Sequence, residues 1–129
     1  MVLDSSAIIS VILKDAHSLE MMERMQQAPV LGVGAPTLLE TAMVLASRFK
    51  REARQLLNRF LAEAQVEIIP FGRDHLEIAL DAFERYGKGR HPAALNFGDC
   101  LTYAVARLSG LPLLYTGEAF SKTDLGAVS

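Results

Sequence analysis

Cysteine and long apolar runs are both scarce in this sequence. Cys100 is the only cysteine among 129 residues, so the chain cannot form an internal disulfide, and this usage suits a reducing compartment. No apolar stretch approaches the roughly 20 residues that a membrane-spanning helix needs. Asp4 interrupts the apolar start at the point where a signal peptide would continue. We therefore expect a cytoplasmic protein with no membrane partner.

Several common catalytic motifs are also missing. There is neither an HExxH nor a CxxC pattern, and the three histidines lie far apart, which argues against a zinc site and against a nucleophilic triad around Cys100. Cys100 is better explained as a small buried apolar residue. Gly32 and Gly34 are too few for a dinucleotide fingerprint.

An excess of positive charge is absent as well. The net charge of −2 gives no global electrostatic footprint for nucleic acid. Binding of a polyanion would have to rely on a bound metal or on local basic clusters. Two such clusters are present, Lys50 with Arg51 and Arg54, and Lys88 with Arg90 and His91. Each is also explained by a solvated helix end or loop.

The residues that are present indicate a globular α/β protein. Half of them are hydrophobic and 22% are charged, and the length fits a single domain spanning 1–129. Strands are predicted at 1–3, 29–34, 66–70 and 112–116, and helices at 5–13, 15–28, 36–49, 51–64, 74–86 and 96–110. This alternation predicts a mostly parallel sheet, in which sites form beyond the carboxyl ends of the strands.

Three carboxylates stand in strongly apolar surroundings. Asp4 follows the apolar start, Glu40 is the only charge within 38–46, and Asp99 opens the apolar run 100–106. Burying an anion costs several kcal/mol unless a cation or hydrogen bonds compensate it. Carboxylates are also the ligands that magnesium and manganese prefer. A metal site assembled by the fold is therefore one interpretation.

Separate structural roles are the other interpretation. Asp4 can cap the first helix, and Asp99 can be the third residue of the last helix after an Asn96 cap, where an acid interacts with the positive helix end. Glu40 has no such simple explanation, because its helix is apolar around most of its circumference and helices of that kind are usually buried. The residues alone leave both interpretations open.

Three segments of the chain carry a recognisable pattern. They are Met-Val-Leu-Asp-Ser-Ser-Ala at the start, Pro36-Thr-Leu-Leu-Glu40, and Tyr86-Gly-Lys-Gly-Arg-His-Pro-Ala-Ala-Leu-Asn-Phe-Gly-Asp-Cys100, which is the most specific of the three. Together they resemble the PIN-domain ribonucleases, and in particular the VapC-type toxins of bacterial toxin–antitoxin pairs. The similarity continues to Leu114-Tyr-Thr-Gly-Glu-Ala-Phe-Ser-Lys-Thr-Asp124, so it covers nearly the whole chain.

This resemblance implies a three-layer α/β/α fold around a central parallel sheet. It also implies a magnesium or manganese site held by Asp4, Glu40 and Asp99. Ser6 matches a small hydroxyl residue that often accompanies the first aspartate, and its expected role is to orient that carboxylate or a metal-bound water.

One departure from the family concerns a fourth acid. Relatives usually carry aspartate in the stretch that corresponds to 117–120, where this chain has Glu118 followed by Ala119. Glu118 can serve as a longer fourth acid. If the family's acid aligns with Ala119 instead, the site has lost a ligand.

By the same resemblance, we expect an Mg²⁺- or Mn²⁺-dependent endoribonuclease toxin that cleaves single-stranded or loop RNA through a metal-activated water. Lys88, Arg90 and His91 are the candidates for holding the RNA backbone. The expected partners are an inhibitory VapB-type antitoxin and a second copy in a homodimer, facing the helices of 15–28 and 36–65. The alternatives are a non-catalytic PIN-like binding module for RNA or a basic peptide, and a PIN-type DNase.

Overall fold

The computed structural model describes residues 1–125, in which short strands alternate with helices. The strands are β1 (Val2–Leu3), β2 (Leu31–Gly34), β3 (Val66–Ile69) and β4 (Leu113–Leu114). The helices are α1 (Ser5–Leu13), α2 (Ser18–Gln27), α3 (Ala35–Phe49), α4 (Ala53–Ala64), α5 (Arg73–Tyr86) and α6 (Phe97–Ser109), with the short 3₁₀ helices η1 (Lys50–Glu52) and η2 (Phe120–Lys122).

The four strands form one parallel sheet in the order β3-β2-β1-β4. Val2 of β1 pairs with Gly32 on one side and with Leu113 on the other. Parallel neighbours need long crossover connections, which the helices supply. The carboxyl ends of all four strands therefore lie at the same edge of the sheet.

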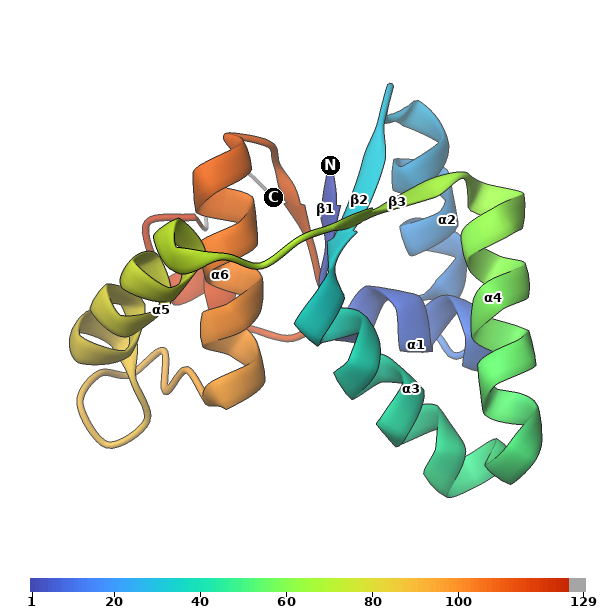
Figure 1. Cartoon of the computed structure of the whole chain (residues 1–129), viewed down its shortest axis with the longest axis horizontal. Helices are drawn as coiled ribbons and strands as arrows, with labels where there is room; N and C mark the ends of the chain where they lie inside the picture. Colours follow the sequence, from blue (N-terminus) through green and yellow to red (C-terminus); the bar gives the residue numbers. More distant parts are fainter. Residues whose placement is uncertain (126–129) are drawn as a thin grey trace.

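Helices cover both faces of this sheet (Figure 1). α5 and α6 lie on one face, and α1 to α4 lie on the other. Successive strand residues point to opposite faces, so Val2 and Leu113 pack into the core with α5 and α6, whereas Leu3 and Leu114 pack into the core on the other side. The expected three-layer α/β/α fold with a central parallel sheet is confirmed.

Local sequence explains several of the helix ends. Asp4 caps α1, Pro36 occupies the first turn of α3, Asn96 caps α6, and Gly110 ends α6 in the left-handed conformation that glycine favours. Every predicted helix and strand is present, with bounds shifted by at most three residues. None of the helices within residues 1–125 is both long enough and apolar enough to span a bilayer.

The expectation that the helix of residues 38–46 is buried, because it is apolar around most of its circumference, is wrong for one side of the helix. Thr37 and Thr41, one turn apart on α3, are buried, whereas Leu39 and Met43 are 64% and 66% exposed. The buried side of α3 therefore contains polar residues, whereas apolar residues on its opposite side face solvent. An apolar sequence predicts burial only where another element covers each side of the helix.

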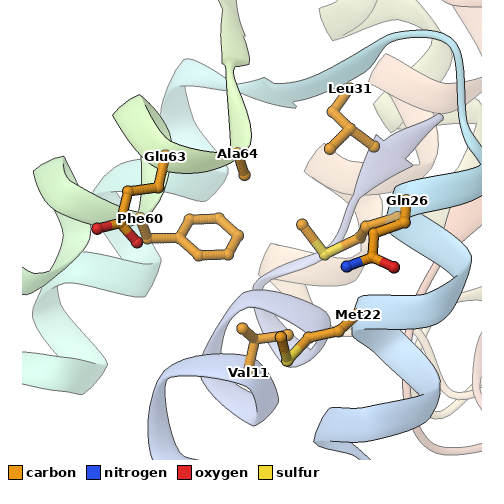
Figure 2. Close-up of a pocket in the computed structure, with 8 residues that line it drawn as sticks. Val11, Met22, Gln26, Leu31, Phe60, Glu63 and Ala64 are labelled. Atoms are coloured by element: carbon orange, nitrogen blue, oxygen red, sulfur yellow. The ribbon is translucent and has the colours of Figure 1, made fainter.

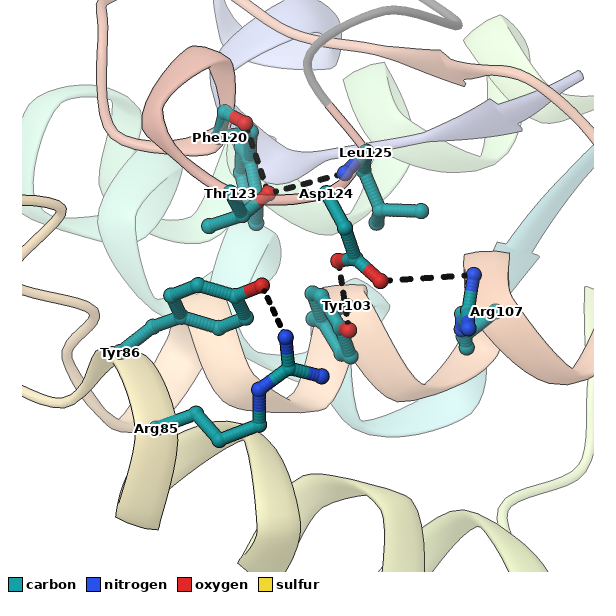
Figure 3. Close-up of polar contacts among 8 residues, drawn as sticks. All are labelled: Arg85, Tyr86, Tyr103, Arg107, Phe120, Thr123, Asp124 and Leu125. Carbon is teal, nitrogen blue, oxygen red and sulfur yellow. Dashed lines mark hydrogen bonds and ion pairs between the residues drawn. The ribbon is translucent and has the colours of Figure 1, made fainter.

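Polar contacts fasten the segment after β4 to α6 (Figure 3). The Tyr103 hydroxyl donates to Asp124 Oδ1 at 2.7 Å, and Arg107 pairs with the other carboxylate oxygen at 3.4 Å. Phe120 is buried and packs edge-on against Tyr115, with ring centroids 5.2 Å apart. Burial and the hydrogen bond to Asp124 raise the pKa of Tyr103 well above its ordinary value. Asp124 thus holds this part of the chain on α6.

Candidate active site

The carboxyl edge of the sheet gathers residues from several elements. Asp4 is the first residue after β1, and α3 begins directly after β2. α6 runs back toward the beginning of β4, so its first turn, which contains Asp99, lies at the same edge. Crevices at this edge are the usual place for sites in parallel α/β sheets. The fold therefore brings the sequence-distant Asp4, Glu40 and Asp99 to one region.

Asp4 is only 5% exposed, and hydrogen bonds hold its carboxylate from both sides. Oδ2 accepts from the Ser6 hydroxyl at 2.6 Å and from the Ser6 amide at 3.2 Å. Oδ1 accepts from the Thr102 hydroxyl at 2.8 Å. The Ser6 hydroxyl oxygen also accepts from the Thr116 amide at 3.0 Å, which ties the chain after β4 to the same group. Donors on both of its oxygens thus fix the orientation of this carboxylate.

Buried threonine hydroxyls continue behind Asp4. Thr102 Oγ1 lies 3.1 Å from Thr37 Oγ1, and Thr41 donates to the Thr37 carbonyl oxygen at 2.7 Å. A threonine hydroxyl carries one proton, and an ionised carboxylate can only accept. Because Thr102 donates its proton to Asp4, it must accept from Thr37. The order of donation is therefore Thr37 to Thr102 to Asp4.

Glu40 reaches the first turn of α6 because position 98 is glycine. A Cβ placed on Gly98 would overlap the Glu40 carboxylate. Burial raises the pKa of Glu40 above its ordinary value, and the negative charges of Asp4 and Asp99 raise it further. A hydrogen bond with the Ser5 side chain opposes these effects only in part.

Asp99 forms a capping box with Asn96 at the start of α6. Its Oδ2 accepts from the Asn96 amide at 3.0 Å, and the Asn96 side-chain oxygen accepts from the Asp99 amide at 2.9 Å. Burial and the charge of Asp4 raise the pKa of Asp99, although the bond from Asn96 lowers it. The structural roles considered for Asp4 and Asp99 are therefore real, and both residues nevertheless lie within electrostatic range of Glu40.

The chemistry of this set fits a hard divalent cation. The three carboxylates supply oxygen ligands, and a cation would relieve the repulsion that raises the pKa of two of them. Within residues 1–125, no three histidine, cysteine, aspartate or glutamate side chains are placed so that they could hold one metal ion together. The structure thus shows an acidic edge with suitable donors rather than a closed protein cage. Magnesium commonly retains several waters and takes only one or two carboxylates.

Glu118 lies outside the group of interacting acids. It is exposed, and its charge is not among those that raise the pKa of Glu40 or Asp99. Its position after β4 places it on the segment that leaves the same edge of the sheet.

The predicted RNA-contacting residues lie on the loop between α5 and α6. Lys88 and Arg90 are exposed, and the Arg90 guanidinium lies over the Phe83 ring at 4.9 Å from its centroid. His91 packs edge-on against Tyr86, with ring centroids 5.0 Å apart. Its Nδ1 accepts a backbone amide two residues further on at 3.0 Å, so this side chain also shapes the loop.

Apart from Ser6, which the sequence analysis names, sequence reasoning missed the residues that surround the acids. Thr37 and Thr102 carried one weak signal, since each is a polar residue within an otherwise apolar helix. Gly98 carried another, because glycine in the first turn of a helix is unfavourable and marks a close approach. Neither signal identifies the partner, which lies on another element.

Comparison with known proteins identifies the family. The PIN-domain family model matches residues 1–125. A Mycolicibacterium smegmatis protein named Ribonuclease VapC is 43% identical over 129 residues, covering 99% of both chains. Ribonuclease VapC30 of Mycobacterium tuberculosis is 38% identical, covering 100% of this chain and 98% of that protein. The chain therefore belongs to the PIN-domain family and, within it, to the VapC ribonucleases.

Solved structures share the fold. Mycobacterium tuberculosis VapC20, described as a sarcin-ricin loop cleaving toxin, has a TM-score of 0.74 at 20% identity, covering 98% of this chain and 92% of that one. A chain of a toxin–antitoxin complex from Klebsiella pneumoniae has a TM-score of 0.71 at 18% identity, covering 96% and 92%. At these identities the likeness concerns the fold alone.

Proposed function

We propose that this protein is a magnesium- or manganese-dependent endoribonuclease toxin that cuts single-stranded or loop RNA. The observation that carries the proposal is that Asp4, Glu40 and Asp99 lie within electrostatic range of one another, so that burial and mutual repulsion favour an added cation. The family supports the reaction class, since relatives with 38% and 43% identity over their full length are named ribonucleases.

Asp4, Glu40 and Asp99 are the residues that would hold the metal. When bound, a divalent ion supplies an activated water and neutralises charge on the phosphate and on the leaving oxygen. Ser6 and Thr102 keep the Asp4 carboxylate in one orientation, so the ligand set loses less conformational freedom on binding.

Glu118 is proposed as a fourth acid at the outer margin of the site. The Thr116 amide contacts Ser6, which brings the segment that carries Glu118 towards Asp4. Its exposure favours a role through water rather than direct contact. Glu118→Gln would test this role, and unchanged metal affinity and rate would remove Glu118 from the site.

Lys88, Arg90 and His91 are proposed to hold the RNA backbone. Cationic side chains attract phosphate and fix the register of a strand without reading its sequence. Because Nδ1 of His91 accepts a backbone amide, the neutral ring carries its proton on Nε2, which is then the nitrogen able to donate to a phosphate oxygen.

A cognate VapB-type antitoxin and a second copy of the chain are the proposed partners. An apolar groove between α1, α2 and α4 is suited to a partner (Figure 2). Its lining consists of Val11, Met22, Met25, Gln26, Leu31, Phe60, Glu63 and Ala64. Methionine side chains adapt to a partner's shape. An arginine on the antitoxin would pair with the acids of the site, and the exposed Leu39 and Met43 of α3 are available to a homodimer.

The proposed activity is tested by incubating the purified protein with labelled RNA and DNA in Mg²⁺, Mn²⁺ or EDTA. We expect RNA cleavage that requires the metal and that falls by at least about a hundredfold in Asp4→Asn and Asp99→Asn. Asp81→Asn, which removes an exposed acid from α5, is the matched control and should cut normally.

The other outcomes of this experiment distinguish the alternatives. Metal-dependent cleavage of DNA but not RNA would indicate a PIN-type DNase. RNA binding without any cleavage would indicate a non-catalytic binding module. Undiminished cleavage by both acid variants would refute the proposed site.

A further inference from the structure

The aromatic side chain at the first position of α6 is largely exposed to solvent. Phe97 is 82% exposed, the largest value among the large hydrophobic residues within 1–125. Phe97 does not cap the helix, because Asn96 and Asp99 form the capping box. Leu95, which is fully buried, packs into the core together with Cys100. Phe97 is therefore available to a ligand.

Phe97 is joined directly to the acidic edge. It precedes Gly98, whose backbone the Glu40 carboxylate contacts closely, and it stands two residues before Asp99. Consecutive Cα atoms are about 3.8 Å apart, so the Cα that carries the ring is at most about 7.6 Å from that of Asp99 and adjoins the residue against which the Glu40 carboxylate lies. A substrate whose bond is cut at these acids has part of its length within reach of this ring.

Two cations on the loop before Phe97 can attract the phosphates of a polyanion. Lys88 and Arg90 are exposed on the loop that leads into the same helix start. Phosphates can therefore lie against the cations while an adjoining base lies against Phe97. Single-stranded nucleic acids are commonly bound in this way, with a positive track for the backbone and aromatic rings for the bases.

We propose that Phe97 is the stacking platform for one unpaired base of the RNA, next to the phosphate that is cut. This inference rests on the proposed ribonuclease function. Every base has a π-face, so stacking tolerates different sequences, but it requires a base that is not already stacked in a duplex. Phe97 thus selects single-stranded or looped RNA over helical RNA without selecting a sequence.

The chain offers a direct optical test, because it contains no tryptophan. Phe97→Trp introduces a single reporter, whose fluorescence is quenched when a base stacks on it. The variant is titrated with a short mixed-sequence oligoribonucleotide, in EDTA and again with Ca²⁺ in place of Mg²⁺. We expect saturable quenching by the single strand and little quenching by the duplex of the same sequence. Equal quenching by both forms, or none in either condition, would overturn the proposal.

Kinetics of three further variants separate stacking from simple apolar contact. Phe97→Ala is expected to raise KM for single-stranded RNA by about 10- to 100-fold. Phe97→Tyr, which keeps an aromatic ring, should remain near the wild type. Phe97→Leu, which keeps apolar bulk without a π-face, should resemble Phe97→Ala. Mn²⁺ affinity should be unchanged in all three, and recovery of KM by leucine would overturn the proposal.

Two results keep this inference separate from the ribonuclease proposal. If the wild type cuts RNA but the fluorescence of the Phe97→Trp variant does not respond to it, stacking is refuted and the nuclease stands. If no RNA is cut but the single strand still quenches, the platform stands and the nuclease fails. A change of fluorescence with protein concentration alone would show that a second copy covers this ring, which also refutes the proposal.

Discussion

At the residue scale, the acids oppose stability in the absence of a cation. Burial and like charges raise the pKa of Glu40 and of Asp99. A group whose folded-state pKa is raised stabilises the fold below its unfolded pKa, and this contribution is lost as the pH rises through the folded value. At neutral pH both ionised acids therefore lower the free energy of unfolding of the metal-free protein.

Glu40→Gln is accordingly expected to stabilise the metal-free protein at pH 7. The advantage of the variant should shrink as the pH is lowered towards about 4, because wild-type Glu40 then becomes protonated and neutral. Urea unfolding in EDTA at several pH values measures this difference. Glu23→Gln, at an exposed position of α2, is the control and should show no such trend. Destabilisation by Glu40→Gln at pH 7 would contradict the prediction.

Thr102→Val tests the hydroxyl chain behind Asp4. Valine keeps the shape of threonine but leaves Asp4 Oδ1 and the Thr37 hydroxyl without their partner, at an expected cost of about 1–3 kcal/mol in unfolding free energy. Mn²⁺ affinity, measured by calorimetry, should also fall, and Thr102→Ser should restore most of it. Thr41→Val removes a hydroxyl that donates only to a carbonyl oxygen and should leave Mn²⁺ affinity unchanged. Equal affinity in Thr102→Val and the wild type would show that the chain does not position Asp4.

Single residues also show what the sequence could and could not reveal. The three acids stand out in the sequence because each lies within or next to an apolar segment. Thr102 was not, because a threonine in a helix is ordinary until its partner is known, and that partner lies 98 positions away. Contacts between residues this far apart in the sequence depend on the fold and are not predicted by a local sequence pattern.

At the element scale, helix ends were predictable and helix surroundings were not. Caps such as Asn96 and Gly110 are read directly from the sequence, and the helices begin and end close to the predicted positions. The environment of α3 was misjudged because its apolar outer stripe has nothing packed on it among residues 1–125. Close packing of α3 on α6 likewise depends on glycines, whose role appears only when both helices are in place.

Gly98→Ala is expected to disturb the geometry of the site without destabilising the helix. Alanine favours a helix by about 1 kcal/mol relative to glycine, but its Cβ would displace the Glu40 carboxylate from α6. We expect a fall of about tenfold or more in Mn²⁺ affinity, with an unfolding free energy within about 1 kcal/mol of the wild type. Gly72→Ala is the control, since a Cβ there meets nothing within 4 Å. Wild-type metal affinity in Gly98→Ala would refute the contact.

At the scale of the whole molecule, the alternation of strands and helices predicted a parallel sheet but not its strand order. The order β3-β2-β1-β4 depends on which faces become buried together. The contacts of Asp124 with Tyr103 and Arg107 were not predictable from the sequence either, because they join two segments that are distant along the chain.

Tyr103→Phe is predicted to loosen the attachment of the segment after β4. Loss of the bond to Asp124 should cost about 1 kcal/mol in urea unfolding at pH 7. Because the pKa of Tyr103 is raised, the protonated Tyr103 hydroxyl stabilises the fold below about pH 10, and this contribution is lost as the pH rises further. The variant should therefore lose less stability than the wild type at alkaline pH. A parallel decline of both proteins would contradict this prediction.

The place of β1 in the sheet also sets the time at which the site can form during synthesis. β1 is made first, yet Val2 pairs with Leu113, and Asp4 receives the hydroxyl of Thr102. Asp99 likewise belongs to the last long helix. A growing chain on its ribosome therefore carries Asp4 before Asp99, Thr102 and β4 have been made. The nuclease proposed here becomes competent only after translation has passed β4, so that an unfinished chain cannot attack the RNA around it.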